Sequence, residues 1–213
     1  MSAEHVLGLV CATGVIPVVV LDDPELARPL GDALKEGGLP VAELTFRTAA
    51  APAALRLLAA DPDLIVGAGT VVSADQVDLA HEAGARFIVT PGFSGRVIDR
   101  CHKLGMAVIP GVATATEVIA ALDYGIDLLK FFPAHASGGV TMLRALQGPF
   151  PQVRFIPTGG VSAANMADYL ALSSVVAVGG SWMVSPERVR GGEFAAVSRL
   201  AREAVQIAAE ART

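Results

Sequence analysis

One lysine stands inside an almost continuous apolar stretch, where a lysine is unusual. Lys130 lies within Asp127–Pro133, whereas the two other lysines of the chain, Lys35 and Lys103, lie in segments with helical patterning. Burying an unpaired ammonium costs several kcal/mol unless its pKa falls or a carboxylate pairs with it. A desolvated lysine with a lowered pKa is the amine that forms Schiff bases with carbonyl compounds. Lys130 is therefore a candidate nucleophile; the alternative is a structural lysine that is ion-paired or extends its ammonium to solvent.

A second stretch places three polar residues at alternate positions. In Val41–Arg47 the side chains of Glu43, Thr45 and Arg47 share one face of an expected strand, and apolar residues share the other. If the apolar face packs under helices, Glu43 is placed to shuttle protons and Arg47 to hold a substrate carboxylate. Thr70, at the end of the next apolar run, is placed to help bind the same group. The alternatives are that Glu43 and Arg47 only neutralise each other, and that Thr70 is an ordinary hydroxyl at a strand end.

Two pairs of glycines end the last two apolar runs. The sequences are Thr158-Gly159-Gly160 and Gly179-Gly180-Ser181. Glycine leaves the backbone N–H groups accessible, and such groups bind anions, phosphate in particular. A single Gly-Gly often marks only a turn, but two at the ends of consecutive runs predict a phosphate site.

Eight short aliphatic runs alternate with amphipathic segments along the chain. The strands and helices that they predict must position the candidate residues named above. The expected strands are Val15–Leu21, Val41–Arg47, Leu64–Val71, Arg86–Gly92, Ala107–Ala113, Asp127–Ala134, Arg154–Gly160 and Val175–Trp182. The expected helices are Pro24–Glu36, Ala51–Ala60, Ala74–Ala83, Gly95–Leu104, Glu117–Tyr124, Met142–Leu146, Asn165–Leu170 and Phe194–Ala209. This strand-then-helix order predicts parallel strands joined by right-handed crossovers.

Eight such units close most naturally into a (β/α)8 TIM barrel. We expect an α/β protein with one compact domain over residues 1–213, and an extra N-terminal helix, Ala3–Ala12, that covers the barrel's bottom. In a barrel, functional residues lie at the C-terminal ends of the strands, where the polar residues above are found. The alternative is an open doubly wound sheet. It would need a glycine-rich turn after the first strand, and Leu21-Asp22-Asp23-Pro24 is not one.

The composition restricts the class of protein. Of the 213 residues 53% are hydrophobic, yet the longest apolar run, Val15–Leu21, is far shorter than the roughly 18 residues of a membrane span. A net charge of −5 without a basic cluster argues against a nucleic-acid partner. The four histidines lack the spacing of metal ligands, so we expect no metal. The N-terminal residues lack the features of a signal peptide, so we expect a cytoplasmic protein.

Five motifs, taken together, resemble the family of 2-dehydro-3-deoxy-phosphogluconate (KDPG) aldolases. The resemblance extends from about Ile16 to the C-terminal helix. The motifs are Glu43-Leu44-Thr45-Phe46-Arg47-Thr48, Gly67-Ala68-Gly69-Thr70-Val71, Lys130-Phe131-Phe132-Pro133-Ala134, Pro157-Thr158-Gly159-Gly160 and Gly179-Gly180-Ser181-Trp182. These aldolases are class I enzymes, so the resemblance implies a Schiff base on the enzyme and neither metal nor cofactor.

The resemblance also implies a role for each matching residue. Lys130 corresponds to the Schiff-base lysine and Glu43 to the general acid and base, while Arg47 and Thr70 correspond to positions that hold the pyruvyl carboxylate. The expected phosphate site comprises Gly159, Gly160, Gly180 and Ser181, and the expected pocket wall comprises Pro91, Phe132 and Thr158. One departure from the family is His135, which stands where an acidic residue often follows the Phe-Phe-Pro-Ala motif.

The expected activity is the reversible cleavage of KDPG to pyruvate and glyceraldehyde 3-phosphate, a step of the Entner–Doudoroff pathway, by a homotrimer. The nearest alternatives are cleavage of the galactonate epimer or of 4-hydroxy-2-oxoglutarate (KHG), which lacks phosphate. A phosphate-binding barrel isomerase or epimerase would need acid and base groups but no imine-forming lysine. A third alternative is a non-catalytic barrel that serves as a sugar-phosphate sensor or interaction module, and the joint presence of Lys130, Glu43 and Arg47 argues against it.

Overall fold

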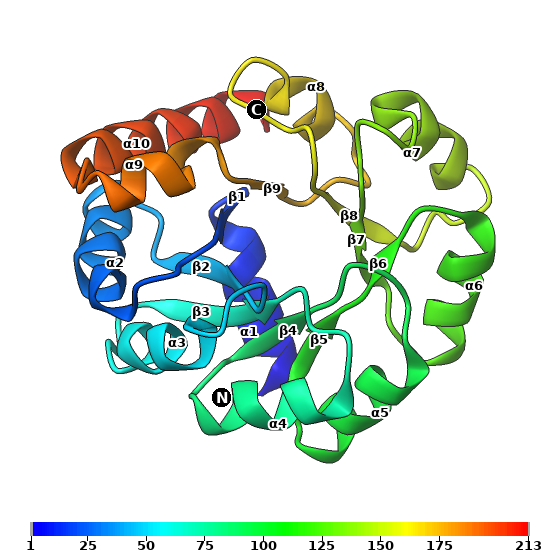
Figure 1. Cartoon of the computed structure of the whole chain (residues 1–213). Coiled ribbons are helices and arrows are strands. Elements are labelled where there is room, and N and C mark those ends of the chain that lie inside the picture. The colour runs from blue at the N-terminus through cyan, green and yellow to red at the C-terminus, as the bar shows by residue number, and fades with distance from the viewer. Residues whose placement is uncertain (1, 213) are drawn as a thin grey trace.

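The computed structural model describes residues 2–212, in which strands and helices alternate along the chain (Figure 1). The strands are β1 Val15–Val19, β2 Val41–Thr45, β3 Ile65–Gly69, β4 Phe87–Val89, β5 Ala107–Ile109, β6 Gly111–Val112, β7 Leu128–Phe131, β8 Arg154–Pro157 and β9 Val178–Gly180. The helices are α1 Ala3–Ala12, α2 Ala27–Glu36, α3 Ala51–Ala59, α4 Ala74–Glu82, α5 Gly95–Lys103, α6 Ala115–Asp123, α7 Gly139–Gln147, α8 Met166–Leu170, α9 Pro186–Arg190 and α10 Phe194–Ala211. Two 3-10 turns, η1 Pro24–Leu26 and η2 Trp182–Val184, complete the elements. Each expected strand contains an observed one.

Every strand pair among residues 2–212 is parallel, as the alternation predicts. Six strands form one sheet in the order β5-β4-β3-β2-β1-β9, and three form a second sheet in the order β6-β7-β8. Only Pro110 separates β5 from β6, so the two sheets share one continuous stretch of chain. The sheets curl, and the helices lie around their outer side (Figure 1). The expected α/β class with parallel strands is confirmed.

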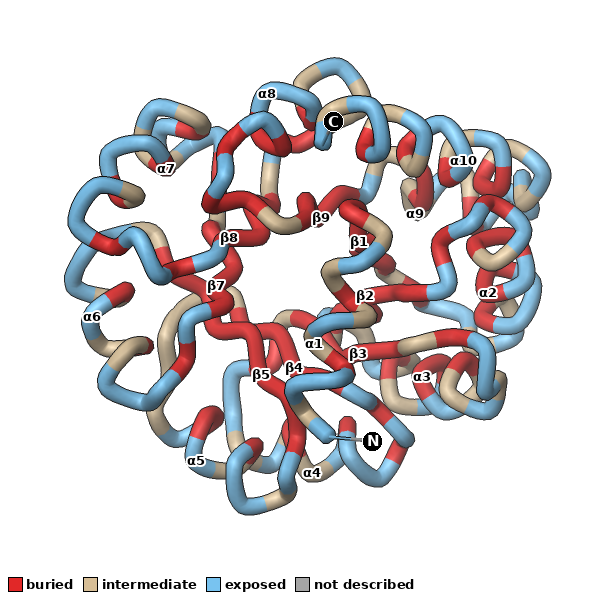
Figure 2. The backbone as a smooth tube through the Cα atoms, turned by 180° about the vertical axis from the view of Figure 1, so that it is seen from behind, coloured by how far each residue is buried: buried red, intermediate tan, exposed pale blue. Residues whose placement is uncertain are grey.

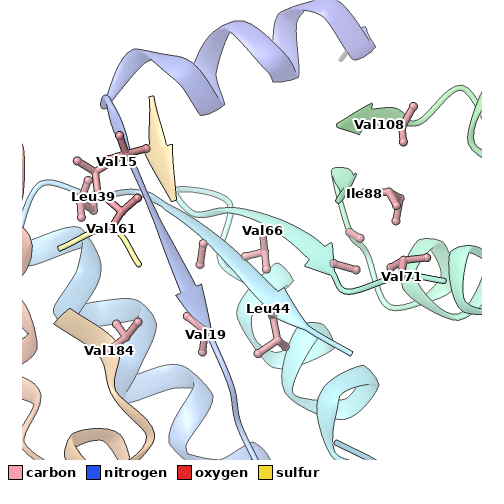
Figure 3. Close-up of a cluster of buried hydrophobic side chains, with 14 of the residues drawn as sticks. Val15, Val19, Leu39, Leu44, Val66, Val71, Ile88, Val108, Val161 and Val184 are labelled. Atoms are coloured by element: carbon pink, nitrogen blue, oxygen red, sulfur yellow. The ribbon is translucent and has the colours of Figure 1, made fainter. Parts of the chain in front are cut away.

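The two faces of the strands enter two separate apolar clusters. The inner cluster consists of Val6, Val10, Ile16, Val41, Phe87, Val89, Ala107, Ile109, Leu128, Ile156 and Ala177. Because these side chains come from both sheets and contact one another, they fill the space that the sheets enclose. The larger outer cluster lies between strands and helices; Figure 3 labels Val15, Val19, Leu44 and Val66 among its members. The tube in Figure 2 shows that the strands are the most continuously buried part of the chain.

The position of a residue within its strand decides which cluster it faces. Val41 in β2 and Leu128 in β7 belong to the inner cluster, whereas Ala42 and Leu129 belong to the outer one. Side chains alternate along a strand, so Glu43 and Lys130, two positions after Val41 and Leu128, also point inward. The expectation that the polar face of Val41–Arg47 points away from the helices is confirmed.

Helix α1 packs against the amino-terminal end of the strands. Its N-cap is Ser2, whose side chain accepts a hydrogen bond from the His5 N–H. Val6 and Val10 are buried in the inner cluster, together with residues from β4 and β5. The expected extra N-terminal helix is therefore present, and it covers the end of the sheets opposite the strand tips that carry the motifs.

Two elements near the C-terminus were not expected from the sequence. After β9 the chain forms η2 and the short helix α9, in which Pro186 occupies the first turn and the Ser185 hydroxyl accepts from the Arg188 N–H. The sequence Ser185-Pro186 is a recognisable helix start. The expected helix Met142–Leu146 also begins earlier, at Gly139, because Gly138 adopts a left-handed conformation and redirects the chain. No helix among residues 2–212 is long and apolar enough to cross a membrane.

Helix α6 begins with a complete capping box that predicts a pH-dependent contribution to stability. Glu117 accepts hydrogen bonds from the Ala113 N–H, the Thr114 N–H and the Thr114 hydroxyl, and the Thr114 hydroxyl accepts from the Glu117 N–H. Burial raises the pKa of Glu117, but the hydrogen bonds lower it by more. The net result is a pKa below its ordinary value of 4.5. The carboxylate therefore stabilises the fold above that value, and the contribution disappears as the pH falls through the lowered pKa.

We expect Glu117→Gln to lower the free energy of unfolding at pH 7 by about 1 kcal/mol, because the amide accepts more weakly than a carboxylate. The difference from the parent should shrink steadily below pH 4.5, as urea titrations over a pH series would measure. Glu82→Gln, at an exposed position at the end of α4, is the control. A deficit that stays constant down to pH 3 would contradict this account.

Candidate active site

Strands β2 and β7 bring together two residues that are 87 positions apart in the sequence. The Lys130 ammonium donates to the Glu43 carboxylate, with 2.9 Å between Nζ and Oε1. Glu43 is 3% exposed and Lys130 is 5% exposed. Glu43 is thus paired with Lys130, and the alternative in which it only neutralises Arg47 is wrong. The ion pair alone fits a structural or a catalytic lysine, so its surroundings decide between the two.

Glycine makes room for this pair. A Cβ on Gly69, in the neighbouring strand β3, would overlap the carboxylate of Glu43. The ring of Phe132 lies on another side, with its centroid 5.3 Å from Lys130 Nζ, a distance at which a ring face attracts a cation. The same strand end also holds Thr45, whose hydroxyl is fully buried and donates to the Val19 carbonyl. Gly69 and Phe132 therefore border the Glu43–Lys130 pair on two sides.

Arg47 and Thr70 meet at the ends of β2 and β3. The Arg47 Nε donates to the Thr70 hydroxyl at 3.4 Å. Thr70 has a φ of 58°, and it is the single non-glycine residue among those described with positive φ. A β-branched residue pays a conformational cost in this region, and such strain is concentrated at functional sites. The unusual backbone brings the Thr70 hydroxyl to the Arg47 guanidinium, so the two side chains lie side by side.

A cavity of about 300 Å³ opens at the carboxyl ends of the strands. Its lining comprises Val18, Val20, Arg47, Phe132, Thr158, Gly159, Gly160, Val161, Gly179, Gly180, Ser181 and Pro186. Phe132 connects the cavity to the ion pair, because its ring both lines the cavity and lies beside Lys130 Nζ. The cavity therefore combines the Arg47 guanidinium, the hydroxyl side chains of Thr158 and Ser181 and two glycine loops next to a buried lysine.

Both glycine loops depend on the absence of a side chain. Gly159 and Gly160 have φ values of 95° and 79°, and a Cβ on Gly160 would overlap His135. A Cβ on Gly180 would overlap the ring of Trp182. The loops can therefore bring backbone N–H groups to the cavity wall in a way that other residues could not.

Most of the residues expected at the site lie together, and some of the cavity wall was not foreseen. Pro91 is not among the described residues that line the cavity; its carbonyl lies against Gly111, the neighbour of Lys130 in β6. Val18 and Val20 were missed, although alternation along β1 places them on the inner face. Pro186 was missed because α9 was not expected.

Comparison with known proteins gives the family. A family model described as "Aldolase: KDPG and KHG aldolase" matches residues 9–200. The chain belongs to this family. Among its relatives, the KHG/KDPG aldolase of Escherichia coli (strain K12) is 45% identical over 207 residues, which cover 96% of this chain and 95% of the relative. The resemblance seen in the five motifs is confirmed.

Solved structures of the KDPG and KHG aldolase family share the fold. The 2-keto-3-deoxy-6-phosphogluconate aldolase of Zymomonas mobilis ZM4, solved with 3-phosphoglycerate, has a TM-score of 0.90 and 38% identity, covering 95% of this chain and 96% of its own. The KDPG aldolase of Legionella pneumophila, solved with pyruvate captured as a covalent carbinolamine intermediate, has a TM-score of 0.89 and 42% identity, covering 91% and 95%. Both cover nearly the whole chain.

The buried ion pair predicts a strong energetic coupling. We expect Lys130→Met or Glu43→Leu alone to destabilise the protein by about 3–5 kcal/mol, because each leaves the partner's charge buried and unpaired. The double variant should be more stable than either single variant, as urea unfolding would measure. The exposed pair of Arg154 and Asp127, 2.8 Å apart, provides the control, where Arg154→Met should cost less than about 1 kcal/mol. Additive losses at Lys130 and Glu43 would refute the coupling.

Proposed function

We propose that this protein is a class I aldolase that reversibly cleaves KDPG to pyruvate and glyceraldehyde 3-phosphate. The observation that carries the proposal is the buried pair of Lys130 and Glu43, beside a cavity that also receives Arg47 and two glycine loops. A phosphate-binding isomerase would need acid and base groups but no imine-forming lysine. The names of the relatives, and the pyruvate carbinolamine in the Legionella pneumophila enzyme, support the same activity.

Lys130 forms the Schiff base in this proposal. Its ammonium passes a proton to Glu43, whose Oε1 is 2.9 Å from Nζ, and the neutral amine adds to the C2 carbonyl of the substrate. Glu43 returns the proton to the hydroxyl of the resulting carbinolamine, which leaves as water. The protonated imine that remains accepts the electron pair of the C3–C4 bond when that bond breaks.

Glu43 carries the proton in the cleavage step. Restored as a carboxylate, it removes the C4 hydroxyl proton through a water molecule, the C3–C4 bond breaks, and glyceraldehyde 3-phosphate leaves. Glu43 then protonates C3 of the enamine, and water hydrolyses the protonated imine to pyruvate and the Lys130 ammonium. Each proton that Glu43 takes is returned within one turnover, so the pair ends in its starting state.

The remaining residues bind the two ends of the substrate. Arg47, with Thr70 against its guanidinium, holds the pyruvyl carboxylate. The phosphate binds at the backbone of Gly159, Gly160 and Gly180 and at Ser181, all of which line the cavity. Phe132 and Thr158 form part of the cavity wall, whereas Pro91 lies behind it, against Gly111. The 3-phosphoglycerate in the Zymomonas mobilis structure supports a phosphate site in this family.

We further propose that the two sheets close into one (β/α)8 barrel, which forms a single domain over 1–213; residues 1 and 213 lie outside the described residues. Two isolated parallel bridges, Phe155 to Val175 and Thr158 to Gly179, support closure between β8 and β9. The two sheets are already continuous at one side, where β5 runs into β6. Pairing of β8 with β9 would join them at the other side and close the barrel. The resemblance to the family also supports a homotrimer in the cytoplasm that uses no metal or cofactor.

A second candidate substrate deserves a direct comparison because the Escherichia coli relative carries both the KHG and the KDPG name. KHG lacks phosphate, and the galactonate epimer of KDPG differs only at C4. The two glycine loops favour the phosphorylated acids. The ratio of kcat/KM for the three acids decides which is the preferred substrate.

Borohydride with pyruvate should trap a covalent adduct on Lys130, which mass spectrometry of the digested protein would locate. Lys130→Ala should give no adduct, because the amine is gone. The chain offers a matched control, since Lys35 and Lys103 are its two other lysines: the double variant Lys35→Arg/Lys103→Arg should trap pyruvate like the parent. An adduct on either of those lysines, or one that survives Lys130→Ala, would refute the proposal.

Glu43→Gln should retain trapping of pyruvate but lose cleavage of KDPG by about 100-fold or more, because the amide cannot exchange protons. Glutamine keeps an oxygen that can accept from Lys130, so the site should stay assembled. Turnover and trapping are measured on the same preparation. Near-normal cleavage by this variant would show that another group carries the proton.

A further inference from the structure

The loop Gly159–Val161 is held from behind at three consecutive carbonyls. The Thr158 carbonyl accepts from the Ala134 N–H at 2.8 Å, and the Gly159 carbonyl accepts from the His135 N–H at 2.9 Å. The third, the Gly160 carbonyl, accepts from the side-chain amide of Asn165 at 2.9 Å. Two of the three tethers are backbone groups, and the third is a side chain.

These tethers determine where the N–H groups of the loop point. In a trans peptide the N–H of one residue points opposite to the carbonyl of the residue before it. The N–H groups of Gly159, Gly160 and Val161 must therefore point away from the three tethers. Gly159, Gly160 and Val161 all line the 300 Å³ cavity, whereas His135 and Asn165 line a separate cavity of about 370 Å³. The loop separates the two cavities, so its N–H groups face the first.

Asn165 is itself fixed and does not act as an ordinary helix cap. Its Oδ1 accepts from the Ser162 N–H at 2.8 Å, so both ends of the amide group are engaged. It precedes helix α8, yet its side chain makes no capping bond to that helix. Helix α8 is anchored by the buried side chains of Met166 and Tyr169. Asn165 is also the sole asparagine of the chain.

We propose that Asn165 is a positioning residue for the substrate phosphate: by holding the Gly160 carbonyl, it turns the Val161 N–H toward the cavity. This inference rests on the proposed function, since it concerns the phosphate end of the same site. Asn165 does not touch the substrate in this account. Its loss releases one peptide unit to rotate, so a donor aimed at a phosphate oxygen is misdirected.

The test separates the phosphate end of the substrate from the reacting end. For Asn165→Ala we expect KM for KDPG to rise about tenfold, equivalent to about 1.4 kcal/mol, with kcat within about twofold. KM for KHG, which has no phosphate, should stay unchanged, and so should pyruvate trapping. Asn165→Asp keeps the acceptor for the Ser162 N–H but faces the Gly160 carbonyl with an oxygen, so it should show at least the same rise. Ser162→Ala, which keeps the backbone bonds of this turn, should behave as the parent.

Two kinetic outcomes overturn the inference. One is an equal rise in KM for KDPG and KHG, which indicates general damage to the site, and the other is no rise in KM for KDPG in either Asn165 variant. A readout without catalysis keeps this test apart from the proposed function. Inorganic phosphate should raise the melting temperature of the parent and of Ser162→Ala more than that of Asn165→Ala. If the parent traps no pyruvate, the proposed function fails, whereas equal stabilisation by phosphate in all variants refutes the role of Asn165.

Discussion

The ion pair between Lys130 and Glu43 imposes conditions on the whole interior. Removing two charges from water is expensive, and only close approach with suitable neighbours compensates for it. The pair therefore needs β2 and β7 on opposite sides of one enclosed space, a glycine in β3 beside the carboxylate, and an aromatic ring near the ammonium. An apolar inner cluster below it supplies the packing that keeps this arrangement in place.

The same pair suits the proposed chemistry because the nitrogen keeps a positive charge in the imine. A protonated imine replaces the ammonium beside Glu43, so the carboxylate faces a cation in both states. The interior does not have to reorganise around a changed charge, which is the advantage of electrostatic groups that are fixed in advance.

Local features were predictable from the sequence, and contacts between distant segments were not. Alternating and helical patterns located the strands and most of the helices, among them α4 and α6. Alternation within Val41–Arg47 placed Glu43 on the inner face. That Lys130 is its partner depends on how the sheets curl, which no local pattern encodes. The left-handed conformation of Thr70 was equally hidden, because a β-branched residue disfavours it. Helix α9 could have been found from Ser185-Pro186.

Helix α1 leaves the interior open at one end only. Val6 and Val10 plug the amino-terminal end together with the inner cluster, so substrate and product share the mouth at the opposite end. Lys130 lies deeper than the glycine loops, since it precedes the end of its strand. In the proposed mechanism, pyruvate bound to Lys130 remains behind the phosphorylated fragment, and that fragment departs first. In the direction of synthesis, pyruvate must enter before the aldehyde. Helix α1, far from the reacting atoms, thus leaves the proposed reaction one opening for every arrival and departure.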